Sequence, residues 1–468
     1  MTVFNILDKA KIDDIIHSAL KILSEVGIKC DHPKTVDILS QKAKITYKNG
    51  RIHLDPASVE EFFQKKKKSF ADVNSNSAVN ANVDFSMGGH WQTWELCDPM
   101  TNMPRPAAYD EAIQMARLSE SLGAAGCPIP VSPGGINPRL NTLISEKIAL
   151  IYTKGLGSYL TATDKNEIGI ISQMHLAAGR KYKLGLEGFI SPLKLNTRVM
   201  DVYFDHCDSA ELDISVMGII PMAGATAPLV FPANLSLVLA DTLGFDYIMQ
   251  TVSDGKHGSF GFRLEPFDFK SCNIVFGNPA WCIYRQAITE LWEGLTGMRP
   301  IGGMFRSSSK MVDAQSIMER TASAVWQAMM GSRIFGAVGQ LSVDEVYSPV
   351  QAILDREILK YLRGLFYGVN KTGWDDDVDI VALIKEGVEA GGFLDHETTA
   401  GYMRKMYDFD VLSKYSNLNA WKAQGCKKID TLAWEEAKLI IKQYDFELDE
   451  NKRKDVEKIY NQGIKYLE

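Results

Sequence analysis

The sequence predicts an α/β protein with a closed TIM-type (β/α)8 barrel at its centre. Between residues 107 and 370, seven short apolar segments typical of strands alternate with amphipathic segments, most of a dozen residues or more. Parallel neighbouring strands need connections of that length, so seven such units in series favour a closed barrel or a large doubly wound sheet. No Gly-x-Gly-x-x-Gly or Gly-x-x-x-x-Gly-Lys-Ser/Thr motif follows a strand, which counts against a nucleotide-binding sheet.

The N-terminal region, residues 1–106, is expected to be a helical extension with one β-hairpin. Apolar residues recur at helical spacing from 8 to 26, and Gly27 follows as a stop. A second helix from Pro33 to Gln41 leads to the hairpin 45–54, whose Asn49-Gly50 pair favours a tight turn. Pro56 then begins another helix, and a strand-rich patch follows between 83 and 96.

The barrel region, residues 107–370, supplies the alternating elements. Its strands are expected at 126–132, 158–164, 188–192, 213–219, 258–263, 301–310 and 333–339, and its helices at 109–122, 142–152, 166–179, 197–207, 232–250, 280–296 and 313–330. The eighth strand is 345–348 or lies earlier in the chain. The C-terminal region, residues 371–468, is predicted to be mostly helical, to pack on the barrel, and to include an exposed helix at 450–467.

Composition excludes several classes of protein. The net charge is −7, with 51 basic against 58 acidic residues, which gives no support for nucleic-acid binding. The seven cysteines form no Cys-x-x-Cys pair, so neither a disulfide framework nor a zinc ribbon is expected, and a reducing cytoplasm suits them. The 27 uncharged residues after Asp213 contain Pro221, Pro228 and Pro232, so they are interpreted as a strand, a turn and a buried helix rather than a membrane span.

Candidate site residues gather where the barrel strands would end, which is the functional face of such a barrel. They are aromatic or charged: Phe260, Phe262, Arg263, Glu265, Phe305, Arg306, Lys310 and Tyr347, with Trp91 and Trp94 earlier in the chain. Aromatic rings bind small cations by cation–π contact, and arginine pairs with carboxylates. The competing interpretation is that the rings are barrel core and the arginines form structural ion pairs. The eight histidines show no His-x-His or His-Glu-x-x-His spacing, so no metal ligands are predicted.

Several segments, in the same order over about 400 residues, resemble the trimethylamine methyltransferase family. They run from Ile16-His-Ser-Ala-Leu and Ile52-His-Leu-Asp-Pro through Ser191-Pro-Leu, Gly224-Ala-Thr-Ala-Pro and Ser309-Lys-x-x-Asp-x-Gln to Gly391-Gly-Phe-Leu-x-His396 and Trp421-x-x-x-Gly425. The resemblance implies a TIM-type barrel and transfer of a methyl group from an amine to Co(I) of a cognate corrinoid protein. Archetypal members carry pyrrolysine, which this chain lacks. It therefore looks like the subgroup that uses quaternary amines such as glycine betaine, carnitine, proline betaine or γ-butyrobetaine.

The resemblance gives the candidate residues expected roles. Phe260, Phe262, Phe305 and Tyr347, completed by Trp91 or Trp94, would form an aromatic cage for the ammonium group. Arg263, Arg306 or Lys310 would bind a betaine carboxylate, and Glu265 would attract the ammonium; no residue is singled out as catalytic.

Partners and alternatives follow from the same resemblance. The corrinoid-ligand motif Asp-x-His-x-x-Gly is not matched at 395–401, so the cobalamin is expected on a separate protein and no cofactor is expected to be tightly bound in this chain. A homo-oligomer is expected, since large barrel enzymes often self-associate. The alternatives are a zinc-dependent, methanol-type corrinoid methyltransferase and a non-catalytic betaine-binding or corrinoid-handling accessory protein.

Overall fold

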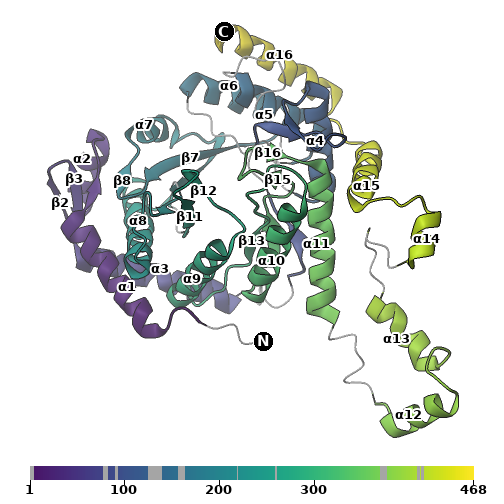
Figure 1. Ribbon diagram of the computed structural model, residues 1–468. Helices are drawn as coiled ribbons and strands as arrows, with labels where there is room; N and C mark the ends of the chain where they lie inside the picture. Colours follow the sequence, from purple (N-terminus) through teal and green to yellow (C-terminus); the bar gives the residue numbers. More distant parts are fainter. Residues whose placement is uncertain are drawn as a thin grey trace.

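The protein is a mixed α/β structure in which helices surround several small sheets (Figure 1). A computed structural model describes residues 5–76, 83–89, 93–124, 140–155, 164–218, 220–258, 261–368, 377–407, 412 and 416–467. The strands expected at 126–132 and 158–163 lie outside these residues. The α/β class predicted from the sequence is confirmed.

The N-terminal elements follow the expected pattern closely. They are α1 (Lys9–Lys21), the π-helical turn η1 (Ile22–Val26), β1 (Ile28–Lys29), α2 (Pro33–Lys42), β2 (Ile45–Lys48), β3 (Arg51–Leu54) and α3 (Pro56–Asn76). Asn49 and Gly50 take φ values of 53° and 72°, the left-handed angles that a two-residue hairpin turn requires. The side chain of Asp8 accepts a hydrogen bond from the Lys11 N–H and so caps α1.

The central helices lie within two residues of their predicted bounds. They are α4 (Tyr109–Ser121), α5 (Asn141–Tyr152), α6 (Lys165–Ala177), α7 (Thr197–His206), α8 (Phe231–Val252), α9 (Pro279–Thr296) and α10 (Ala314–Met329), followed by α11 (Pro349–Tyr367). Asp164, Asn278, Asp313 and Ser348 accept backbone hydrogen bonds as N-caps of α6, α9, α10 and α11. The start of each of these helices is therefore encoded locally.

The N-terminal hairpin and the first central strands form one continuous sheet. Its order is β2-β3-β1-β8-β7-β9, with β7 at Tyr182–Ile190, β8 at Lys194–Leu195 and β9 at Leu212–Gly218. The β7–β9 pairing is parallel, as the connection through α7 demands, and β1 joins the sheet by pairing in parallel with β8. The hairpin is thus joined to the central strands by backbone pairing as well as by side-chain packing.

Three smaller sheets contain the remaining strands. Their orders are β10-β11-β12 (Met222–Ala223, Glu265–Asp268, Asn273–Ile274), β13-β14-β4 (Gly302–Met304, Ile334–Gly336, Ser86–Met87) and β15-β16-β5-β6 (Gln340–Leu341, Val346–Tyr347, Glu95–Cys97, Pro104–Arg105). The β10–β11, β13–β14, β14–β4 and β16–β5 pairs are parallel. Among the described residues these pairings do not close into a ring, so the TIM-type barrel stays a prediction.

The long uncharged segment forms a strand and a buried helix rather than a membrane span. It contains most of β9, then β10, and it ends within α8, of which most residues are buried. Helices α1, α2 and α3 pack on α8. A Cβ placed on Gly244 would lie 2.6 Å from Cδ1 of Ile28, so the N-terminal extension approaches α8 too closely for a larger residue. In the described part of the chain, no helix is both long enough and apolar enough to cross a bilayer.

The C-terminal helices divide into two groups. Helix α15 (Ile429–Gln443) packs on α11 and α4, and α16 (Glu450–Leu467) packs on α6 and α5, where Val456 and Tyr460 are buried. The expected exposed helix at 450–467 therefore exists, but one of its faces is covered. Helices α12 (Ile380–Glu389), α13 (Glu397–Tyr407) and α14 (Leu418–Ala423) extend away from the rest of the chain (Figure 1).

Candidate active site

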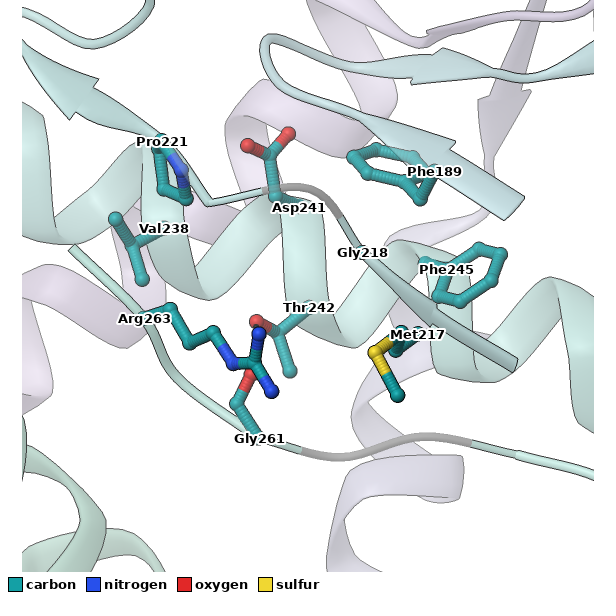
Figure 2. Close-up of a pocket in the computed structure, with 10 residues that line it drawn as sticks. All are labelled: Phe189, Met217, Gly218, Pro221, Val238, Asp241, Thr242, Phe245, Gly261 and Arg263. Carbon is teal, nitrogen blue, oxygen red and sulfur yellow. Dashed lines mark hydrogen bonds between the residues drawn. The ribbon is translucent and has the colours of Figure 1, made fainter. Parts of the chain in front are cut away.

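A small pocket lies where β7 and β9 end, beside α8 and the segment that leads into β11 (Figure 2). Its volume is about 180 Å³. It is lined by Phe189, Met217, Gly218, Pro221, Val238, Asp241, Thr242, Phe245, Gly261 and Arg263. The carboxyl ends of parallel strands are the usual location of ligand sites in α/β proteins.

Asp241, on α8, supplies a buried carboxyl group to this pocket. One oxygen accepts a hydrogen bond from the Ser191 hydroxyl at 2.5 Å, and the other accepts one from the Leu193 N–H at 2.9 Å. Burial raises the pKa of Asp241 to about 7, although these two hydrogen bonds lower it. A cation bound nearby would favour the ionised form of this carboxyl group.

Two aromatic rings form one wall of the pocket. Phe189 from β7 and Phe245 from α8 have ring centroids 5.2 Å apart at an interplanar angle of 45°. The thioether of Met217 lies close to them, and Figure 2 shows these three side chains on one side of the pocket. Ring faces and a polarizable sulfur suit the methyl groups of a small organic cation.

Arg263 lines a different part of the pocket, away from the two rings (Figure 2). Its neighbours in the chain alternate in direction. Phe262 and Leu264 belong to the hydrophobic core, whereas Arg263 interacts electrostatically with Glu265. This alternation is that of a strand, and it places the two charged residues on one face.

Glu265 is the centre of a buried ionic cluster next to the pocket. Burial raises the pKa of Glu265 to about 7, against the lowering effects of Arg285, Arg306, the Trp281 side chain and Arg263. Arg306 also forms an ion pair with Asp344 and donates a hydrogen bond to the Val343 carbonyl at 3.2 Å. Three guanidinium groups, those of Arg263, Arg285 and Arg306, therefore lie near the Glu265 carboxyl group, and Asp344 pairs with one of them.

The described rings of the predicted aromatic cage lie in different parts of the structure. Phe262 packs edge-on against Trp292 at 5.6 Å, whereas Phe305 and Tyr347 belong to a different core cluster, where Phe305 stacks near Phe335. All three rings are buried. Trp94 is 60% exposed. Phe260 and Trp91 lie outside the described residues.

The predicted basic residues lie in three settings. Arg263 is at the pocket, and Arg306 is buried in the ionic cluster with its guanidinium 4.4 Å from the Phe276 ring centroid. Lys310 is exposed, and its Nζ donates to the Ser308 carbonyl at 2.6 Å. Lys310 lines a separate cavity of about 510 Å³ beside β11 and β12.

Four residues of the site were missed by sequence reasoning. Asp241, Phe245 and Arg285 lie on the helices α8 and α9, whereas the predicted candidates came from the ends of the expected strands. Phe189 lies near the end of β7, a strand in which the exposed Lys183 and Glu187 alternate with buried apolar residues. The local signal for Asp241 was its position directly after the uncharged stretch and within a helix expected to be buried, because a buried helix seldom contains a carboxylate.

No group of three or more histidine, cysteine, aspartate or glutamate side chains is placed to hold a metal ion in the part of the chain that the structure describes. His396, the residue nearest to the corrinoid-ligand motif, has its Nδ1 2.8 Å from Thr398 Oγ1 and its Nε2 3.4 Å from the Glu386 carboxylate. Both ring nitrogens thus have partners within the C-terminal helices.

The fold and the site define an α/β protein with a compact pocket that presents a carboxyl group and two rings together with a guanidinium. Residues 184–461, more than half of the chain, match the family model described as trimethylamine methyltransferase (MTTB). The chain belongs to this family, as the sequence motifs predicted, and its relatives are methyltransferases.

Two relatives show how far the similarity extends. The glycine betaine methyltransferase of Desulfitobacterium hafniense (strain Y51) is 22% identical over 439 residues, covering 89% of this chain and 88% of the relative. The trimethylamine methyltransferase MttB of Methanosarcina thermophila is 22% identical over 258 residues, covering 54% of this chain and 51% of the relative. The chain therefore aligns with nearly the whole of the first relative and with about half of the second.

Proposed function

We propose that this protein removes a methyl group from a small zwitterionic quaternary amine and transfers it to the Co(I) corrinoid of a separate protein. Membership of the methyltransferase family supports the reaction class. The near full-length similarity to a protein named glycine betaine methyltransferase supports the substrate class. The observation that carries the proposal is the pocket itself, in which Asp241 and the Phe189 and Phe245 rings accompany Arg263.

A betaine has the complementary arrangement of charges. Its trimethylammonium group would contact the two rings and Met217, with cation–π contacts each contributing about 0.5–2 kcal/mol, and Asp241 would add electrostatic attraction. Its carboxylate would pair with the guanidinium of Arg263, which lines the same pocket. These roles differ from those predicted for the cage, of which Phe262 lies in one core cluster and Phe305 and Tyr347 lie in another.

The proposed reaction requires the protein mainly to bind the substrate and to orient it. A quaternary ammonium loses a methyl group to a Co(I) nucleophile and departs as a neutral tertiary amine, so no proton donor is required. The residues of the pocket would remove water from the cation and hold one methyl group in a reactive position. The corrinoid would be carried by a partner protein, and the contacts of His396 with Thr398 and Glu386 support this part of the proposal.

The test is methyl transfer from a panel of amines to free cob(I)alamin, followed by the absorbance of methylcobalamin. The panel contains glycine betaine, carnitine, proline betaine, γ-butyrobetaine and trimethylamine. At least one betaine is expected to react and trimethylamine is expected to fail. If a betaine binds to the protein but no methylcobalamin forms with any member of the panel, the chain is a binding protein and the proposal is wrong.

A pair of matched variants connects the activity to this pocket. Phe189→Leu removes a ring from the pocket wall, whereas Phe335→Leu removes an equally buried ring from the other core cluster. Phe189→Leu is expected to lower kcat/KM by roughly tenfold, which is the loss of about 1.4 kcal/mol of cation–π contact. Equal losses in both variants would show that the effect comes from weakened packing and that the pocket is not the binding site.

A further inference from the structure

The C-terminal helices α12 to α14 present an apolar strip that the described residues leave uncovered. On α12, Ile380, Ile384 and Val388 are spaced by four residues, so they lie along one face, and they are 71%, 49% and 69% exposed. Val381 beside them is 78% exposed, and Leu394, after the helix, is 88% exposed. We call these five residues the α12 strip.

The α12 strip belongs to a locally ordered unit. The Phe393 ring packs directly on Gly387, where an added Cβ would overlap it. The hydroxyl of Thr399 donates to the Phe393 carbonyl at 2.6 Å, and His396 contacts both Thr398 and Glu386. These contacts connect α12 to α13 and fix the inner face of α12, so that the strip is an outward surface formed before any partner binds.

An exposed strip of this composition is costly in water. Its side chains present apolar area on the order of several hundred Å², comparable with the ~300–600 Å² of the largest patch on a typical monomer, which is often functional. A stable interface buries about 800 Å² per partner, so a strip of this size accounts for a large part of one. Figure 1 shows α12 and α13 apart from the rest of the chain, so the strip is accessible to another molecule.

We infer that a second copy of this chain covers the α12 strip, with the two α12 helices antiparallel about a two-fold axis at Ile384. The spacing favours self-pairing, because this axis places Ile380 opposite Val388 of the partner subunit and Ile384 opposite its own counterpart. All of these residues are β-branched and similar in size, as a two-fold interface that uses the same surface twice requires. The strip itself contains no charged residue that would call for a partner of opposite charge. This inference does not depend on the proposed function.

Cross-linking through a cysteine at the axis tests the geometry. Ile384→Cys places a thiol next to its own counterpart across the axis, whereas Leu439→Cys on α15 places one on a side chain of the same 49% exposure elsewhere. Under mild oxidation the Ile384→Cys chain is expected to become a covalent dimer on a non-reducing gel. The wild-type chain and Leu439→Cys should remain mostly single chains. Equal cross-linking of the two variants would overturn the inference.

A charge-reversal pair tests the association itself. By light scattering, the wild-type particle is expected to have at least twice the 52.1 kDa mass of one chain. Ile384→Glu and Ile384→Lys should each halve that mass, because like charges meet at the axis, and mixing the two variants should restore it. Circular dichroism would show that both variants fold. A monomeric wild-type chain, or unchanged mass in the single variants, would contradict the inference, and another protein would then be the occupant of the strip.

Discussion

Arg263→Ala gives the most direct test of how the pocket recognises its substrate. The change removes the guanidinium from the pocket, while Arg285 and Arg306 still compensate the charge of Glu265, so the fold is expected to persist. A hydrogen-bonded contact with a charged group contributes about 1.5–3 kcal/mol, which corresponds to a loss of roughly 10- to 150-fold in kcat/KM for a betaine. The loss should fall mainly on KM, because the carboxylate is bound equally before and during methyl transfer.

The discriminating measurement compares two substrates that share the trimethylammonium group. Initial rates of methylcobalamin formation would be measured for glycine betaine and for tetramethylammonium, with the latter used as a competitive inhibitor if it does not react. Arg263→Ala is expected to weaken only the betaine, since tetramethylammonium has no carboxylate. Arg299→Ala, an exposed arginine paired with Glu293, is the matched control and should change neither. Equal losses for both molecules in Arg263→Ala would refute the anchoring role.

Three further outcomes test the buried polar groups and the close packing of the fold. Burial raises the pKa of Asp241 to about 7, so the folded state holds a proton that the unfolded state loses at about pH 4. The protonated carboxyl group therefore stabilises the fold fully below about pH 4, and this stabilisation is lost as the pH rises to about 7. In urea unfolding measured across this pH range, Asp241→Asn should remove a few kcal/mol of the change in the free energy of unfolding. Arg320→Ala should lower the free energy of unfolding by about 3–5 kcal/mol, since it leaves Asp355 charged and fully buried without its 2.7 Å ion-pair partner, and a loss under 1 kcal/mol would contradict this. Gly244→Ala should lower the free energy of unfolding by about 1–3 kcal/mol, because the added methyl group overpacks the core. Gly401→Ala is the control, since nothing lies within 4 Å of the new Cβ, and it should not lower the free energy of unfolding. The midpoint of urea unfolding measures the effect of both changes.

The helices could be predicted from the sequence because their signals are local. The apolar spacing of four residues and caps such as Asp164 and Asn278 fix each helix with information from a few neighbouring positions. The Asn49-Gly50 hairpin was predicted for the same reason. The strand predicted at 258–263 was placed too early in the chain, because the pairing of β11 with β10 begins at Glu265.

The site could be predicted only in part. Arg263, Glu265 and Arg306 were expected at strand ends, and the structure brings them into electrostatic contact. Phe262 and Phe305 were expected beside them, but successive residues of a strand point to opposite sides, and a continuous apolar run does not show which side faces the site. Arg285 reaches the cluster from α9, a contact between distant segments that no local pattern encodes.

The pairing of β4 with β14 has a consequence for how the chain is made. Ser86 of β4 pairs with Ile334 of β14, so the ribosome adds about 250 residues between the synthesis of the two strands. At about 5–20 residues per second, the ribosome completes β14 roughly 10–50 s after β4. During that interval β4 lacks β14, the strand with which it pairs, and its unpaired backbone is open to association with other nascent chains. A chain released before residue 334 cannot complete this sheet at all.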